Sequence, residues 1–156
     1  MATIYEHDPI CRNVLYTAVQ AGHLNDVKTL VSKGFPITSD CFNWAITYGH
    51  LEMVQFLHSH GARITGESIG SAANGHLEIL KYLCENGGLA YADDNYPIKI
   101  AAKKGYLEIV KYLHSQGADA TADDEPLMLA GRAGHSEVVH FISACYNNEV
   151  KMIPLL

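Results

Sequence analysis

The sequence predicts an all-α solenoid of about five stacked helix-turn-helix repeats with short loops. Three observations indicate this fold class: one phrase recurs along the chain, its copies are almost evenly spaced, and each copy carries apolar residues at helical intervals. The phrase is clearest as "NGHLEILKYLCENGG" from Asn74 and "KGYLEIVKYLHSQGA" from Lys104. Recurrence at a fixed period of roughly 20 to 50 residues is typical of repeat architectures. The repeats therefore decide how every later motif is interpreted.

A glycine in each copy of the phrase marks its spacing. These glycines are Gly22, Gly49, Gly75, Gly105 and Gly134, so the successive steps are 27, 26, 30 and 29 residues. The array then occupies residues 13–146, with units at 13–38, 39–64, 65–94, 95–123 and 124–146. Residues 1–12 form an N-terminal lead-in, and residues 147–156 form a C-terminal tail or the start of a further repeat.

The first half of each unit is predicted to be a short helix. In the fourth unit, "PIKIAAKKG" places Ile98, Ala101 and Ala102 at i, i+3 and i+4, which is the spacing of one helix face. Pro97 and Pro126 stand where such a helix begins, and proline is favoured there because its missing N–H would have no intrahelical partner. A tight turn at Gly-His or Gly-Tyr follows.

The second half of each unit is predicted to be another short helix, antiparallel to the first. In "YLEIVKYLHSQG" the residues Leu107, Val110 and Leu113 form one apolar row. Glycine commonly ends a helix, and Gly87 and Gly117 stand at the expected ends. A single pair of such helices buries too little apolar surface to offset the conformational entropy of ordering it. We therefore expect neighbouring units to share one core.

These units resemble the ankyrin-repeat family, whose consensus runs roughly T-P-L-H-x-A-A-x-x-G-H-x-x-I-V-x-x-L-L-x-x-G-A. The fourth unit reads "YPIKIAAKKGYLEIVKYLHSQGAD" and the fifth "EPLMLAGRAGHSEVVHFI", and the resemblance covers about Asn13 to Tyr146. It implies an ankyrin-like solenoid and a non-catalytic module that binds a protein partner on its concave face. The array is also similar to those of large DNA viruses of amoebae, which would make it a viral or host-directed adaptor. A structural spacer or docking array for other domains is the alternative.

The chain departs from the family pattern at two positions of the first helix. The usual Thr is replaced by Asn13, Asp40, Gly66, Tyr96 and Glu125, and the usual first His by Tyr16, Asn43, Ile69, Lys99 and Met128. The family's Thr-to-His hydrogen bonds are therefore expected to be absent, with Asn13 and Asp40 capping their helices instead. The short periods also remove residues from the segment that usually forms a β-hairpin, so we expect little strand.

The resemblance also implies a binding strip. In ankyrin stacks the two residues before each turn glycine are exposed on the concave side. Here these pairs are Gln20 and Ala21, Thr47 and Tyr48, Ala73 and Asn74, Lys103 and Lys104, and Arg132 and Ala133. Those expected to contact the partner are Gln20, Thr47, Tyr48, Asn74, Lys103, Lys104 and Arg132. Tyrosine and arginine are enriched at binding hot spots, and the basic end would steer a partner with an acidic patch. Simple solvation of the three basic side chains is the alternative.

Other residues are better explained by structure than by contact with a partner. Trp44 stands where the family usually has Leu and is expected to be buried between helices. The acidic segments "ADDN" (92–95) and "ADDEP" (122–126) precede first helices, where negative charge is favourable. A charge-patterned binding rim is the alternative for these two segments.

Composition limits the class of partner and the cellular location. A formal net charge of −6 argues against nucleic acid, because binding to its phosphates depends on Lys and Arg. No apolar run approaches the roughly 18 residues that a membrane span needs, and the N-terminus is too polar for a signal peptide. We expect a monomer in the cytoplasm, or the host cytoplasm if the source is viral, and no membrane partner. A nuclear location reached by passive entry is the alternative.

Neither the histidines nor the cysteines indicate a metal site or another cofactor. His23, His50, His76 and His135 share one repeat position beside the turn glycine, which indicates a structural role. His58 and His60 are two residues apart and would point away from each other on a helix. The cysteines, Cys11, Cys41, Cys84 and Cys145, lack close spacing and are interpreted as reduced, packed thiols, with reactive or disulfide chemistry as the alternative.

The sequence shows no motif for catalysis. The glycine-rich stretches "ENGGLA" and "RITGESIGSAANG" lack the lysine of a phosphate-binding loop. Polar residues follow the repeat register instead of converging on one pocket. We therefore expect no enzyme activity.

The end of the chain suggests two interpretations. Residues Ile153 to Leu156 resemble Glu125 to Met128, which open the fifth unit. The chain is then either a fragment of a longer array or ends in a natural tail that covers the last apolar face.

Overall fold

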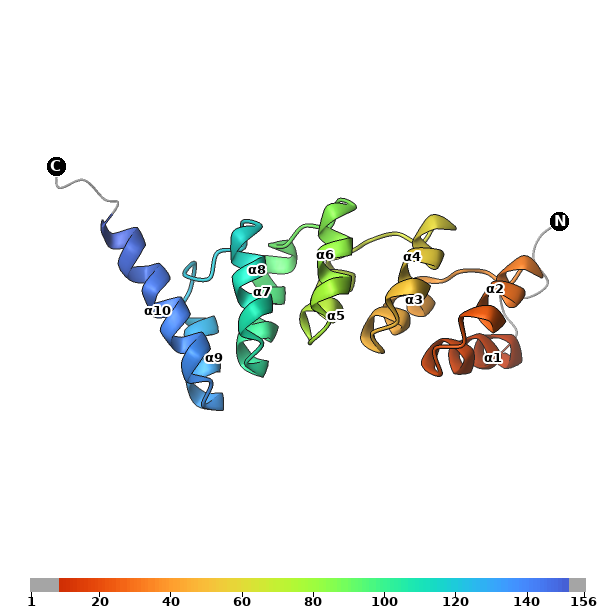
Figure 1. The fold of residues 1–156 in the computed structure, drawn as a ribbon, viewed down its shortest axis with the longest axis horizontal. Coiled ribbons are helices and arrows are strands. Elements are labelled where there is room, and N and C mark those ends of the chain that lie inside the picture. The colour runs from red at the N-terminus through yellow and green to blue at the C-terminus, as the bar shows by residue number, and fades with distance from the viewer. Residues whose placement is uncertain (1–8, 152–156) are drawn as a thin grey trace.

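The structure is a computed structural model that describes the backbone of residues 9–151 and the side chains of residues 13–147. Within this part the chain forms ten helices and no strand. The helices stand in pairs, side by side in one elongated row that runs from one terminus to the other (Figure 1). The predicted all-α solenoid with short loops is confirmed.

Each pair joins a first and a second helix through a tight turn. The first helices are α1 (Pro9–Gln20), α3 (Ser39–Thr47), α5 (Gly66–Ala73), α7 (Ala92–Lys104) and α9 (Glu125–Ala133). The second helices are α2 (Leu24–Ser32), α4 (Leu51–Ser59), α6 (Leu77–Glu85), α8 (Leu107–Ser115) and α10 (Ser136–Lys151). First helices of neighbouring pairs pack on one another in chain order, so one continuous stack results.

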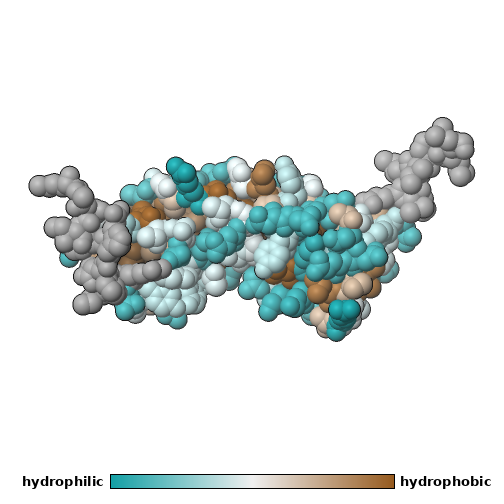
Figure 2. Space-filling view, turned by 180° about the vertical axis from the view of Figure 1, so that it is seen from behind, coloured by the Kyte–Doolittle hydropathy of each residue, from teal (hydrophilic) through white to brown (hydrophobic). Residues whose placement is uncertain are grey.

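The core lies within and between the pairs. Fully buried side chains come from both helices of successive units and include Val19, Val27, Ile46, Leu57, Ile69, Leu80, Leu83, Ile98, Leu113 and Ile142. Full burial of one such side chain contributes about 2 kcal/mol, so each interface between units adds several of these contributions. The face of the array in Figure 2 is mostly hydrophilic, with small hydrophobic patches between.

The turn glycines allow two features that another residue would prevent. Gly49 and Gly105 adopt left-handed backbone conformations, each with φ of +78°. The histidine ring of the next unit lies directly over each of them. A Cβ on Gly49 would lie 2.8 Å from Cε1 of His76, and one on Gly105 would lie 2.5 Å from Nδ1 of His135. Glycine is thus required for both the turn and the approach of the neighbouring unit.

The turn histidines hydrogen-bond to the unit before them. Nε2 of His50 lies 3.3 Å from the carbonyl oxygen of Gln20, Nε2 of His76 lies 2.9 Å from that of Thr47, and Nε2 of His135 lies 3.1 Å from that of Lys103. A carbonyl oxygen only accepts, so Nε2 donates in each bond. The structural role predicted for these three histidines is confirmed.

The other two units vary this arrangement. In the fourth unit Tyr106 takes the place of histidine, and its ring lies 3.3 Å from the position of a Cβ on Gly75. In the first unit the side chain of His23 is 64% exposed, with Nδ1 3.4 Å from the carboxylate of Asp26.

The prediction that Asn13 and Asp40 cap helices is wrong. Asn13 lies inside α1, and Asp40 lies in the first turn of α3. The cap of α3 is Thr38, whose hydroxyl accepts a hydrogen bond from the backbone N–H of Cys41 at 3.3 Å. The cap of α5 is Thr65, which forms a reciprocal capping box with Ser68. The helices begin just after these threonines because a hydroxyl in extended backbone can accept from the first turn.

Three helices cross the predicted unit boundaries. One of them is α7, which begins at Ala92 in the predicted third unit and continues into the fourth. α1 begins at Pro9, inside the expected lead-in, and α10 continues past residue 146 to Lys151. Tyr146 occupies the place at which glycine ends earlier second helices, so nothing in the backbone stops α10 there. Elsewhere the division into units stays a prediction. Residues 153–156, which resemble the start of a further repeat, lie outside the described residues, as do residues 1–8.

Candidate protein-interaction surface

The predicted binding strip lies at the ends of the first helices and the turns that follow them. All seven residues expected to contact a partner are exposed: Gln20, Thr47, Tyr48, Asn74, Lys103, Lys104 and Arg132. Ala21 and Ala133 are exposed too. The expectation of exposure is wrong for Ala73, which is fully buried. There, Tyr106 of the next unit reaches over the adjoining turn at Gly75.

Three aromatic side chains form a connected group at the N-terminal end of this strip. The hydroxyls of Tyr16 and Tyr48 lie 3.1 Å apart, and the ring of Tyr16 meets that of Trp44 edge-on with centroids 4.4 Å apart. The hydrogen bond to Tyr16 raises the pKa of Tyr48 above its ordinary value. Trp44 is partly buried against the core, as expected. The exposed Tyr48 is therefore held in place by its neighbours.

Three basic side chains form the other end of the strip. Lys103, Lys104 and Arg132 are exposed, and none of them takes part in an ion pair within the described part of the chain. Their charges are available to a partner.

Lys99 connects the two acidic segments, a role that sequence reasoning missed. Its Nζ lies 2.9 Å from a carboxylate oxygen of Asp123, 3.0 Å from one of Glu125 and 3.8 Å from one of Asp94. The hydrogen bonds to Asp123 and Glu125 raise the pKa of Lys99, and the same contact lowers the pKa of Asp123. The sequence offered one indication of this role, because Lys99 stands where the family usually has histidine. Both acidic segments therefore contribute carboxylates to one ionic cluster around Lys99, and this cluster links the fourth unit to the fifth.

A groove crosses the first helices of the third and fourth units. One hollow of about 590 Å³ is bordered by Thr47, Glu67, Ser71, Asn74, Tyr96 and Lys104. A second of about 300 Å³ reaches Leu129 of the fifth unit, and both hollows are lined by Asp93, Tyr96, Ile100 and Lys103. The groove adds Glu67, Asp93, Tyr96 and Ile100 to the predicted strip. In the sequence, the groove could have been inferred from Gly70, because the second unit has the large side chain of Trp44 at the same repeat position.

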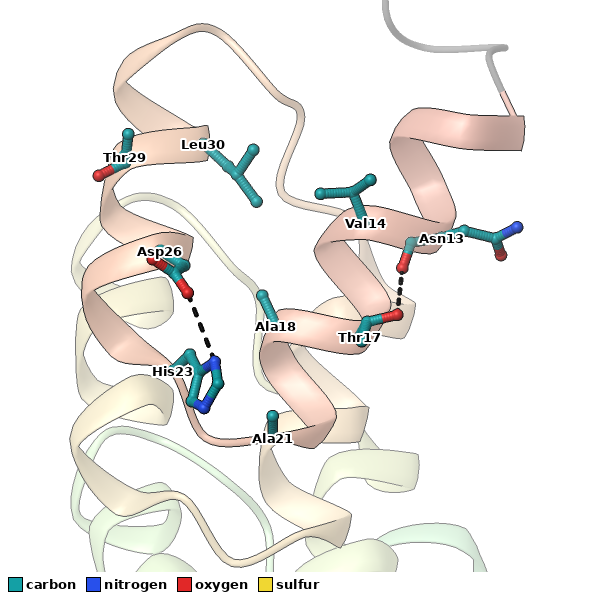
Figure 3. Close-up of a pocket in the computed structure, with 9 residues that line it drawn as sticks. All are labelled: Asn13, Val14, Thr17, Ala18, Ala21, His23, Asp26, Thr29 and Leu30. Carbon is teal, nitrogen blue, oxygen red and sulfur yellow. Dashed lines mark hydrogen bonds and ion pairs between the residues drawn. The ribbon is translucent and has the colours of Figure 1, made fainter.

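A third hollow, of about 630 Å³, lies on the outer face of the first helix pair (Figure 3). Val14, Ala18 and Leu30 point into it from α1 and α2, and Val14 is 49% exposed. In every other pair the equivalent face is covered by the preceding unit. Among the described residues, no helix pair lies on the N-terminal side of this surface.

The histidines and cysteines of the described region take part in contacts within and between units. No group of three or more His, Cys, Asp or Glu within that region could hold a metal ion. Nδ1 of His58 lies 2.8 Å from the hydroxyl of Tyr82, and Nδ1 of His60 lies 2.9 Å from the carbonyl oxygen of Phe56. Cys41 is buried, and burial raises the pKa of the Cys84 thiol. Nor does any helix in residues 9–151 have the length and apolar character to cross a membrane.

Comparison with known proteins identifies the repeats. A family profile described as "Ankyrin repeats (3 copies)" matches residues 68–153, which is more than half of the chain. No curated protein matches the chain. Ankyrin repeats are generally protein–protein interaction modules, and the family is typically non-catalytic. The matched region contains the basic end of the strip and the part of the groove that runs from Gly70 to Leu129, and the same helix pair recurs on its N-terminal side. The chain belongs to the ankyrin-repeat family.

Proposed function

We propose that this chain is a non-catalytic adaptor that binds a protein partner through the exposed ends of its first helices. The observation that carries the proposal is the row of seven exposed residues, one or two from each unit, that ends in three basic side chains without an ion pair among the described residues. Aromatic and arginine side chains are frequent hot spots, and unpaired charges at a rim increase the rate of association with a complementary partner.

The proposed partner is a protein with an acidic patch that faces Lys103, Lys104 and Arg132. Tyr48, held by Tyr16, would be an apolar anchor at the other end of the same contact. We further propose that the chain acts as a monomer in the cytoplasm, of the host if the source is viral, and that nucleic acid and membranes are not its partners.

A second candidate function is a spacer or docking array for other domains. It is favoured by the apolar hollow at Val14, Ala18 and Leu30, on whose N-terminal side no described helix pair lies, so that another repeat could stack there. Changing Val14→Glu would weaken such stacking without touching the binding strip.

Affinity capture with crosslinking from cells of the source organism would test the adaptor proposal. The natural chain would be compared with Tyr48→Ala, with the double change Lys103→Glu/Lys104→Glu, and with Lys33→Glu as an exposed control away from the strip. We expect both strip variants to lose the same partner, which Lys33→Glu retains. Equal capture of every partner by all variants would exclude the strip.

A further inference from the structure

The longest spacing in the array, 30 residues from Gly75 to Gly105, contains an inserted left-handed turn. Asp93, Asp94 and Asn95 have φ values of 50°, 58° and 59°, so the backbone at the start of α7 is kinked and not helical. Asp and Asn tolerate this conformation better than other side chains, but three in succession are unusual. The side-chain oxygen of Asn95 accepts a hydrogen bond from the backbone N–H of Asp119 at 3.1 Å, which ties the turn to the next loop.

The inserted turn borders a position at which the array lacks a side chain. Five residues before their turn glycines the other units have Thr17, Trp44, Ile100 and Leu129, whereas the third unit has Gly70. The ring of Tyr96 lies 3.3 Å from the place of the missing Cβ. Tyr96 is 51% exposed, and Ile100 beside it is half-buried. Together they give the groove an apolar floor.

Opposite charges border this floor on its two sides. The carboxylate of Asp93 lies over Gly66 at the start of α5, and the ring of Tyr106 lies over Gly75 just after its end, so α5 and α7 run in the same direction. Glu67 and Asp93 therefore lie along the edge where the helices start, and Lys103 and Lys104 along the edge where they end. Seven or eight helical residues separate the edges by about 11 Å.

These four charges are not used within the fold. Glu67, Asp93, Lys103 and Lys104 are all exposed, and the ion pairs of the described residues include none of them. A uniformly acidic ligand in the groove would be attracted by the lysines and repelled by Glu67 and Asp93. The groove thus favours a ligand that carries both signs of charge.

We propose that the groove binds an extended segment of the partner protein in which an apolar residue is accompanied by one acidic and one basic residue. This inference rests on the proposed function and specifies its partner. Successive side chains of an extended chain point in opposite directions, so charged residues at an odd spacing face opposite edges. The acidic one meets Lys103 and Lys104, the basic one meets Glu67 and Asp93, and the apolar one covers Tyr96.

Selection from a phage library of random linear peptides tests this assignment. The purified chain is the target, and Ser71→Phe, which fills the groove from α5, removes peptides that bind elsewhere. We expect enriched peptides with an acidic and a basic residue at odd spacing beside an apolar residue. Their affinity should fall about tenfold for Glu67→Lys and for Lys104→Glu, as expected for loss of one ionic contact. Lys33→Glu should bind as the natural chain does.

A charge exchange supplies the decisive comparison. The variant Glu67→Lys/Lys104→Glu should bind a peptide with its two charges exchanged, and circular dichroism should show that every variant is helical. Failure to enrich peptides, enrichment of peptides with only one sign of charge, or binding unaffected by Glu67→Lys or Ser71→Phe would overturn the inference. Glu67 and Ser71 lie outside the strip of the proposed function. Partner capture that depends on Lys103 and Lys104 while the peptide result is negative would therefore retain that function and exclude only the inference.

Discussion

The hydroxyl of Ser68 donates a hydrogen bond of 2.9 Å to the side-chain oxygen of Asn43, and both side chains are buried between α3 and α5. Leaving one partner of a buried hydrogen bond unpaired costs more than removing both. We expect Ser68→Ala to lower the free energy of unfolding by about 2 kcal/mol, because Asn43 loses its partner and α5 loses part of its capping box. Urea denaturation followed by circular dichroism measures this change.

The double variant Asn43→Leu/Ser68→Ala is the matched control. It removes both polar groups. Its loss of unfolding free energy should therefore be smaller than the sum of the losses measured for Asn43→Leu and for Ser68→Ala. Strict additivity would mean that the two side chains do not interact across the units.

The hydrogen bond from His76 to the carbonyl oxygen of Thr47 predicts a difference between histidines of the same register. We expect His76→Ala to cost about 1.5 kcal/mol, since it loses the bond between units and the cover of the turn. His23 occupies the same place in the first unit but is largely exposed, so His23→Ala should cost less than about 0.5 kcal/mol. Chemical denaturation measures both changes. Equal losses of unfolding free energy in His76→Ala and His23→Ala would contradict a role of His76 in stacking.

The close approach of His76 to Gly49 predicts a large effect of a single methyl group. Gly49→Ala places a Cβ against the ring in a backbone conformation unfavourable to alanine, and we expect a loss of about 3 kcal/mol. Gly61 also has a positive φ, but no atom lies within 4 Å of its Cβ position. Gly61→Ala should therefore cost only about 1 kcal/mol. Thermal unfolding of both variants separates the backbone contribution from the steric one.

The ionic cluster at Lys99 predicts a pH-dependent difference in stability. The pKa of Lys99 is raised, so its contribution is present below the ordinary lysine value of about 10.4 and lost as pH rises through the folded value. The pKa of Asp123 is lowered, so its contribution is present above the ordinary carboxyl value and lost as pH falls through the folded value. Lys99→Met should therefore unfold at a lower Tm at pH 7, and the difference should shrink below about pH 4.

Lys81→Met serves as the control for this pH dependence. Among the described residues Lys81 pairs only with Glu78 of the same helix, so its loss should have little effect at either pH. A pH-independent difference for Lys99→Met would contradict the ionic explanation.

The helix pairs and their turns could be predicted because their signals are local. Periodic apolar residues define the helices, and glycines such as Gly49 mark the left-handed turns. The repeated histidine was interpreted correctly because its position recurs with the glycine. These features depend on residues a few positions apart, which the sequence displays directly.

Other features depend on contacts between units and could not be predicted from spacing alone. Lys99 meets Glu125 of the fifth unit across 26 residues, and Ala73 is buried beside a turn that Tyr106 covers from the next unit. The left-handed turn at 93–95 has no counterpart in the repeat pattern, so nothing in the consensus suggested it. The charged groove follows from that turn and from the absent side chain at Gly70.

The turn histidines donate to main-chain oxygens of Gln20, Thr47 and Lys103, which are residues of the exposed strip. A carbonyl group is the same whatever side chain accompanies it. Substitution at these positions can therefore alter recognition while leaving the bonds between units intact. An array built this way can evolve new specificities without losing its architecture, and the same three positions are suitable for randomisation in the design of a new binding protein.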